Sequence, residues 1–431
     1  MAFLCHSAEA MKRKKQRKPR QSQPKSKLSI LRQVCDLIPS HLVGKLSRKH
    51  GVDKKSRAFS VWSHVVSMLF AQISGAISLN DVCDNLRNHG GILATIRGAL
   101  VPSRNGLSHA NKVRNSAMAE ELFWETLAHH EQQTPSFGRS GPRKRKRGIP
   151  RRFKRIIHAV DSSTIKLVAN CITWAKHRRR KAAAKLHLRL NVGSFLPGFA
   201  IVEAADHNDN FRARELCAAI LAGEIVVFDK AYVDFRHLFD LARRGVFWVT
   251  RAKDNMKYRV VKRLIKKPVG NILRDDIIML TTKKSKAAYP ETFRRVIALV
   301  EVDGKMQEMT FITNHTEWAA NSVCELYQSR WEIEVFFKQI KQNLKLCDFL
   351  GNSANAVGWQ VWMALLVYVL LRYLGHVSDW NHSFSRLFTL IRGMLWDKMA
   401  LGEILGRYGT AGGSFRMLGR PDQAYLPGFT P

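Results

Sequence analysis

The chain has 431 residues and carries 71 Lys and Arg against 34 Asp and Glu, a formal net charge of +37. Hydrophobic residues make up 45%, which excludes a mostly disordered chain and predicts two or three domains with sizeable cores. So large a basic excess indicates a polyanionic partner, with nucleic acid as the leading candidate and a solvated basic surface as the alternative.

Cysteine usage and hydropathy indicate a reducing compartment and no membrane contact. The seven cysteines are scattered and form no CxxC pair, which argues against a disulfide framework and against a zinc finger. The N-terminal segment lacks the apolar run of a signal peptide. The most apolar run, residues 361–371, is shorter than the ~20 residues a membrane-spanning helix needs, and therefore predicts a buried core helix.

The first third of the chain predicts a basic arm followed by helices. Residues 1–27 are rich in Lys and Arg and predict a disordered arm that contacts DNA electrostatically, or else a solvated tail. Residues 28–133 show helical spacing throughout, with Ser78 and Asp81 in the positions of a capping box. This helical N-terminal domain could bind DNA through a helix-turn-helix-like unit, or serve in oligomerisation or packing; the pattern leaves both open.

Residues 134–154 predict a basic linker, which either contacts phosphate or is a solvated loop. From residue 155 the periodicity becomes β-β-β-α-β-α-β, which predicts an α/β sheet with antiparallel and parallel parts. Residues 255–320 predict a β-rich insertion with a hairpin turn at Asp303-Gly304. Residues 376–431 are expected to be a C-terminal tail, Gly- and Pro-rich beyond Tyr408.

Two aspartates follow apolar strands in the same way. Asp161 in "IIHAVDSS" and Asp229 in "IVVFDKAY" each stand where the strand is expected to end. Carboxylates held there by buried neighbours suit hard cations such as Mg²⁺. A turn or helix-capping role for either residue is the alternative from these two segments alone.

The segment "YQSRWEIEVFFKQIKQNLK", residues 327–345, predicts one amphipathic helix with a polar stripe. At 100° per residue the stripe falls within an arc of roughly 60°, extended slightly by two further lysines. Its members are Tyr327, Arg330, Glu334, Lys341, Lys338 and Lys345. Glu332 points away from the stripe, so the geometry selects Glu334 as the functional acid. A structural Glu334–Lys338 pair at i,i+4 remains the alternative.

These residues resemble a known family. The spacing Tyr327-x2-Arg330-x3-Glu334-x6-Lys341 is similar to the Y-R-E-K signature of the DDE transposases of bacterial insertion sequences. "HAVDSST", "FDKAY" and "WVTRAKDN" resemble the segments around the first two acids, although Lys230 and Ala231 stand where the family often has Arg and Gly. The resemblance implies a ribonuclease-H-like catalytic core over residues 155–375, with the β insertion before the glutamate helix.

The resemblance also implies an activity. Asp161, Asp229 and Glu334 would bind two Mg²⁺ ions, with Mn²⁺ able to substitute, and the protein would cut DNA at transposon ends and join them to target DNA. The implied partners are double-stranded DNA, as terminal inverted repeats and target, and a second copy in a homodimeric synaptic complex. The implied location is the bacterial cytoplasm, in association with the nucleoid.

Several other residues are expected to contact DNA. By resemblance, Tyr327, Arg330 and Lys341 contact phosphates around the cut end. Trp248, on the strand after Asp229, either stacks on an extruded base or is a core residue. The remaining expected DNA contacts are basic side chains: Lys338, Lys345, Lys230 and Lys185.

Two other interpretations fit the same sequence. A catalytically inactive or domesticated transposase would act only as a DNA-binding protein, but would not need an intact set of three acids. A structure-specific nuclease on the same fold would need the acids, but would leave the full Y-R-E-K stripe unexplained.

Overall fold

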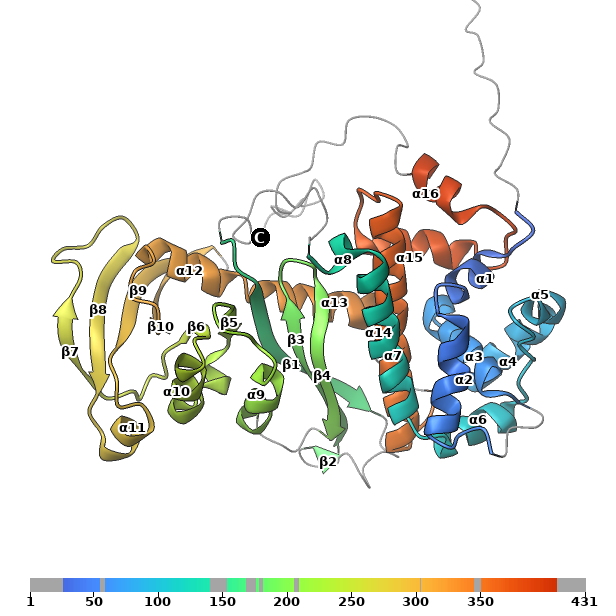
Figure 1. Cartoon of the computed structure of the whole chain (residues 1–431), viewed down its shortest axis with the longest axis horizontal. Helices are drawn as coiled ribbons and strands as arrows, with labels where there is room; N and C mark the ends of the chain where they lie inside the picture. Colours follow the sequence, from blue (N-terminus) through green and yellow to red (C-terminus); the bar gives the residue numbers. More distant parts are fainter. Residues whose placement is uncertain are drawn as a thin grey trace, which may run out of the picture.

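The computed structural model describes residues 26–54, 59–139, 153–167, 176–177, 181–204, 209–302, 304–344 and 350–408. Nearly all of the expected basic arm, much of the basic linker, Lys345 and the segment after Tyr408 lie outside these residues. The protein combines N-terminal helices with a large mixed sheet, and helices cover both faces of that sheet (Figure 1).

Short polar caps define the N-terminal helices. Ser60, Ser78 and Ser103 each accept a hydrogen bond from the backbone three residues on, and the capping box at Ser78 and Asp81 is confirmed. Gly75 ends one helix at φ 71°, a conformation that favours glycine. The helices are α1 (Ile30–Cys35), α2 (Ser40–Lys49), α3 (Val61–Ser74), α4 (Leu79–Asn88), α5 (Gly90–Ala94), α6 (Arg104–Val113), α7 (Ala117–Gln133) and α8 (Pro135–Arg139).

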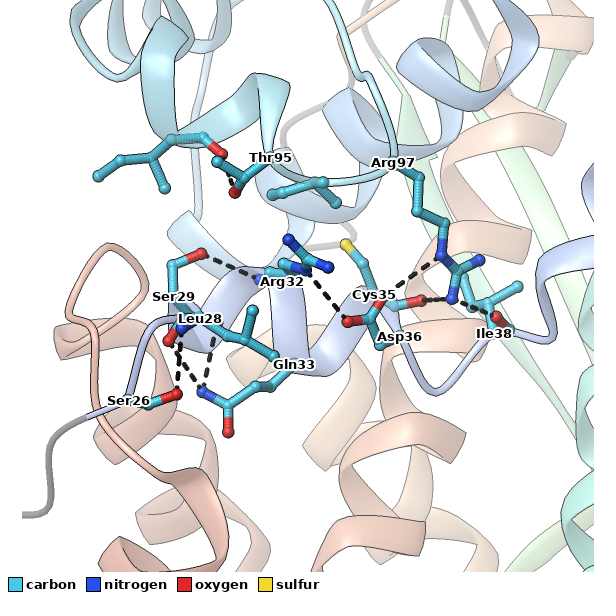
Figure 2. Close-up of polar contacts among 12 residues, drawn as sticks. Ser26, Leu28, Ser29, Arg32, Gln33, Cys35, Asp36, Ile38, Thr95 and Arg97 are labelled. Carbon is cyan, nitrogen blue, oxygen red and sulfur yellow. Dashed lines mark hydrogen bonds and ion pairs between the residues drawn. The ribbon is translucent and has the colours of Figure 1, made fainter.

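Arg97 joins the first helix to the segment that precedes α6. Its guanidinium donates to Asp36 at 3.2 Å and to the Ile38 carbonyl at 2.9 Å, as Figure 2 shows. The same group lies 4.8 Å from the centroid of the Trp62 ring. Arg97 has a positive φ of 49°, and these contacts hold it in that turn.

The sheet follows the predicted order of strands and helices. Its strands run β2-β3-β1-β5-β6-β10-β9-β8-β7, with β4 paired to β3. β1 is antiparallel to β3 and parallel to β5, and β5 is parallel to β6. The bounds are β1 (Ile157–Leu167), β2 (Lys176–His177), β3 (Lys181–Asn191), β4 (Leu196–Ala204), α9 (Asp209–Cys217), β5 (Ile225–Phe228), α10 (Phe235–Arg243) and β6 (Phe247–Arg251).

The β-rich insertion continues the same sheet instead of forming a separate one, because β10 pairs with β6. Three of its strands were predicted, whereas the first was not, since its residues are exposed and show no alternation of apolar and polar side chains. Gly304, the second residue of the predicted hairpin turn, has a φ of 73°. The elements are β7 (Tyr258–Arg263), β8 (Ile272–Leu280), α11 (Lys283–Ala288), β9 (Phe293–Val302) and β10 (Lys305–Thr313).

A long apolar helix, α14 (Ala354–Val377), lies between the N-terminal helices and the sheet (Figure 1). It is long and apolar enough to cross a membrane by composition, but 89% of its apolar window is buried inside the protein. The core-helix prediction is therefore supported, although the helix has 24 residues and extends well beyond the apolar run 361–371.

The C-terminal segment contains helices that were not predicted. These are α15 (Phe384–Gly393) and α16 (Leu401–Tyr408). The Ile30 amide donates to the Asp397 carbonyl at 3.0 Å, so the two ends of the described chain pack together. One hydrophobic core includes residues from α1 to α16 and one face of the sheet. The helical region and the α/β region thus share a core, and the predicted linker does not separate two independent ones.

Candidate active site

Strand register brings the first two acids to the same level of the sheet. The parallel pairing of β1 with β5 ends at Val160 and Phe228, and the residues that follow are Asp161 and Asp229. Asp229 directly follows β5, as predicted. Asp161 is different, because β1 continues to Leu167 through its antiparallel pairing with β3. Asp161 is therefore a mid-strand residue that is held rigidly, not one at a strand end.

The predicted single helix of residues 327–345 is wrong in one respect. The structure has two helices, α12 (Ala320–Gln328) and α13 (Trp331–Asn343), with a tight turn at Ser329 and Arg330. There the amide of Arg330 bonds to the carbonyl of Tyr327 at 3.0 Å, three residues back instead of four. The turn changes the angles expected from a continuous helix, yet Tyr327, Arg330 and Glu334 still face the sheet.

Two residues of this segment connect all three acids. The Tyr327 hydroxyl donates to Asp229 Oδ1 at 3.2 Å. The Arg330 guanidinium donates through Nη1 to Asp161 Oδ2 at 3.0 Å and through Nη2 to Glu334 Oε1 at 2.6 Å. Side-chain exposure is 14% for Arg330, 20% for Asp161 and 36% for Glu334, so the ion pairs are partly shielded from water.

The electrostatics show that the carboxylates are close enough to interact. The pKa of Asp161 is raised to about 6, mainly by burial; the Ser162 amide and the Arg330 charge oppose this rise, and the negative charges of Asp229 and Glu334 add to it. Burial lowers the pKa of Arg330, but Tyr327, Glu334 and Asp161 together raise it above its ordinary value. Arg330 therefore stays charged and partly neutralises a cluster of like charges.

The carboxylates of Asp161, Asp229 and Glu334 suit a divalent cation, but the Arg330 guanidinium lies between two of them. Carboxylate oxygens are the ligands that hard divalent cations prefer. In the part of the chain that the structure describes, no three His, Cys, Asp or Glu side chains already stand as a metal-binding group. Arg330 bridges Asp161 and Glu334 instead, so the guanidinium would have to move before both carboxylates could share a metal ion.

The lysines of the predicted stripe take different positions. Lys341 Nζ donates to the Thr164 carbonyl on β1 at 2.9 Å, so it lies beside the strand that carries Asp161. Lys338 is exposed on α13. Lys230 directly follows Asp229 and pairs with the exposed carboxylate of Asp254 at 3.3 Å. Lys345 lies outside the described residues.

Two expected DNA contacts are not placed at this site. Trp248 is fully buried on β6, packed against Tyr289 and Phe293, so its ring has no access to a base; the core interpretation is correct. Lys185 lies on β3, opposite Thr164 of β1. Thr164 is three residues from Asp161 along β1, so the two point to opposite faces. Because side chains alternate along a strand, Lys185 lies on the other face of the sheet.

Sequence reasoning missed Arg251. The pairing of β5 with β6 ends at Phe228 and Thr250, so Arg251 continues the row of Asp161 and Asp229. Its charge is near enough to oppose the rise in the pKa of Tyr327, which burial raises to about 12. The signal was present in the sequence, since Arg251 follows a buried strand as directly as Asp229 does.

Comparison with known proteins agrees with this geometry. Residues 152–370 match a family described as "Transposase DDE domain", and residues 26–96 match a "Domain of unknown function (DUF4372)". A "Putative transposase y4zB" from Sinorhizobium fredii is 30% identical over 71% of this chain and 81% of that protein. A "Probable transposase for insertion sequence element IS5377" from Geobacillus stearothermophilus is 28% identical over 52% of this chain and 58% of that protein.

Among solved structures, a piggyBac transposase synaptic complex with hairpin DNA aligns at a TM-score of 0.42 and 9% identity, over 89% of this chain and 80% of that chain. That likeness is too distant to argue from, whereas the family match covers half of the chain and includes all three candidate acids. The chain therefore belongs to the DDE transposases of bacterial insertion sequences, enzymes that act on DNA.

Proposed function

We propose that Asp161, Asp229 and Glu334 are the catalytic carboxylates of this transposase and that they bind two Mg²⁺ ions, for which Mn²⁺ can substitute. One observation carries the proposal: Tyr327 and Arg330, from a single turn of the chain, contact all three acids. Such a network has no need of three carboxylates if its only role is structural, because one ion pair would hold α13 against β1.

We also infer that the core is ribonuclease-H-like. The support is the arrangement β4-β3-β1-β5-β6, in which the first three strands alternate in direction and the last three are parallel. Asp161 then stands on the central strand and Asp229 after its parallel neighbour. The third acid comes from α13, which packs across the same face.

Each candidate side chain has a role that follows from its position. When bound by Asp161, Asp229 and Glu334, divalent ions would supply Lewis-acid activation of a water and stabilisation of the leaving oxygen. Asp161 and Glu334 must first release Arg330, whose planar guanidinium can then donate two parallel bonds to a phosphate of the DNA end. Tyr327 would orient Asp229 in the resting protein and turn its hydroxyl to a phosphate when DNA binds. Lys341 would add a positive charge beside β1.

The reaction proposed is cleavage followed by joining. A water attacks the phosphodiester at the transposon end, and the freed 3′-hydroxyl attacks target DNA, or the opposite strand to form a hairpin. An element has two ends, and each chain carries one set of three acids. We therefore infer that two copies act together on two terminal inverted repeats.

The test uses a labelled duplex copied from the DNA that flanks the gene. Purified protein with Mg²⁺ should nick this duplex at the element end and join it to a supercoiled plasmid, while EDTA should abolish both products. Nicking without joining would favour a structure-specific nuclease. Binding without either product, in Mg²⁺ and in Mn²⁺, would favour an inactive DNA-binding protein.

A further inference from the structure

Helix α6 presents one polar face that the rest of the protein does not use. Its exposed polar side chains follow the spacing i, i+1, i+4, i+5 and i+8, which is a single face of a helix. They are Arg104, Asn105, Ser108, His109 and Lys112. The helix contains no acid, and none of these five side chains forms a hydrogen bond or ion pair with another described residue.

Several other cations of the helical region are paired with acids, whereas those of α6 are not. Lys45 contacts Glu125 at 2.9 Å, and Lys49 also bonds to a glutamate of α7. Arg97 is committed to Asp36, as the close-up in Figure 2 shows. Paired charges of this kind present little net field, whereas the α6 face combines unmatched positive charge with amide, hydroxyl and imidazole groups.

The arrangement of the helices alone would suggest α4, instead of α6, as the helix that contacts DNA. The helices α3 and α4 meet at 104° across a short turn that begins with Gly75, an arrangement typical of a helix-turn-helix unit. However, several polar side chains of α4 already bond within the helix or to its N-terminal cap. Asp81 completes the capping box, Asp84 pairs with Arg87 at 3.1 Å, and Asn85 bonds to a backbone carbonyl at 2.8 Å. Its two acids would also face phosphate unfavourably.

The inner side of α6 is fixed firmly to the rest of the molecule. The carbonyl of Arg114, at the end of α6, accepts bonds from Trp359 at 2.6 Å and from Asn355 at 2.5 Å. Beneath the helix, buried Asn111 bonds to His64 at 2.8 Å. Trp359 and Asn355 belong to α14, which also packs against α13, the helix of Glu334. A ligand on α6 would therefore be held at a fixed position relative to the candidate site.

We propose that the exposed face of α6 reads base edges in the major groove of the duplex at the element's ends. This inference rests on the proposed function. The major groove admits an α-helix, Arg suits the two acceptors of guanine, and Asn suits the acceptor and donor of adenine. Arg104 and Asn105, at the start of the helix, face the bases, and Lys112 contacts a phosphate. The helix lies between the two family matches, at residues 26–96 and 152–370, and belongs to neither.

The experiment measures binding of the full chain to two duplexes without divalent metal, so that no cleavage occurs. One duplex is copied from the DNA flanking the gene, and the other is a scrambled sequence of the same composition. Asn105→Ala and Arg104→Ala should each lower the preference for the flanking duplex on the order of 10-fold or more. Lys112→Ala should weaken binding to both duplexes equally and reduce the slope of affinity against salt by about one.

A control variant and a measurement of thermal stability separate loss of base recognition from loss of charge or of folding. Arg48→Ala removes an exposed cation of α2 and should leave the preference between the duplexes unchanged. All these positions are exposed, so thermal unfolding should not change. Unchanged preference in both Arg104→Ala and Asn105→Ala would overturn the proposal, as would loss of preference on Asn85→Ala or Arg87→Ala in α4. Metal-dependent cleavage that requires Glu334 would still stand in that case, which separates failure of this inference from failure of the proposed function.

Discussion

The Arg330 guanidinium lies 3.0 Å from Asp161 Oδ2 and 2.6 Å from Glu334 Oε1, so one cationic side chain joins acids from β1 and α13. These acids are 169 and 4 residues from Arg330 in the sequence. In the protein without metal or DNA, the guanidinium offsets their mutual repulsion. A metal ion would compete with it for the same oxygens, and that competition can be measured.

We expect Arg330→Gln to destabilise the metal-free protein and to increase its response to metal. Removal of the guanidinium leaves two partly buried carboxylates without their charged partner, which costs about 1.5–3 kcal/mol in the free energy of unfolding. Added Mg²⁺ or Mn²⁺ should then raise the melting temperature of the variant more than that of the wild type. Thermal unfolding with and without metal checks both effects.

Lys338→Gln is the matched control, since it removes an exposed cation from α13 without touching the acids. Its metal response should equal that of the wild type. An equal response in the Arg330 variant and the wild type would mean that the guanidinium does not compete with metal.

A second prediction concerns the buried ion pairs of the insertion. Arg294 and Asp275 are 4% and 5% exposed in their side chains, and Arg294 also bonds to the Thr316 carbonyl. Arg294→Met should therefore lower the free energy of unfolding by about 3–5 kcal/mol, because it leaves a buried carboxylate unpaired. Urea titration measures this loss.

The exposed pair Arg87–Asp84, at 64% exposure on both sides, provides the comparison. Arg87→Met should change the free energy of unfolding by no more than about 1 kcal/mol. Comparable losses in the two variants would show that burial does not set the strength of these pairs.

A third prediction concerns acid stability. Burial lowers the pKa of His64 from 6.5 to about 3 in the folded chain, against its bond to Asn111. The unfolded chain therefore takes up a proton first as the pH falls. The stability that neutral His64 contributes is complete above pH 6.5 and is lost progressively toward pH 3, by about 1.4 kcal/mol per pH unit.

His64→Gln should flatten the dependence of unfolding free energy on pH between these limits, since glutamine does not titrate there. The slope that remains would come from the other shifted groups, among them His130 and His237, whose pKa values burial lowers to about 4. An unchanged slope in the variant would show that His64 is accessible to protons in the folded state.

Elements with a local sequence pattern were predictable, whereas an element without one was not. The strands around Asp161 and Asp229 were predictable because each is a short apolar run, and buried parallel strands have that composition. The capping box at Ser78 was predictable because it depends on neighbouring residues only. The strand β7 was missed because it is an exposed edge, where charged side chains replace the usual alternation.

The candidate site was predictable in its members but not in its contacts. Helical angles selected Glu334 over Glu332, although they assumed a continuous helix and the chain turns at Ser329. The bridge from Arg330 to Asp161 joins residues far apart in sequence, so no local pattern could reveal it. Trp248 was ambiguous for the same reason, because only the packing of Tyr289 and Phe293 around it shows that it is buried.

The central claim is that Glu334 completes a catalytic set with Asp161 and Asp229. The most direct test is metal-dependent nicking of the flanking duplex by Glu334→Gln, with Glu332→Gln, two residues away on α13, as its matched control. We predict that Glu334→Gln binds the duplex as the wild type does but loses nicking by more than about 100-fold, beyond the loss typical when only an outer-shell partner of a metal ligand is removed. Glu332→Gln should nick normally. Normal nicking by Glu334→Gln, in Mg²⁺ and in Mn²⁺, would contradict the assignment.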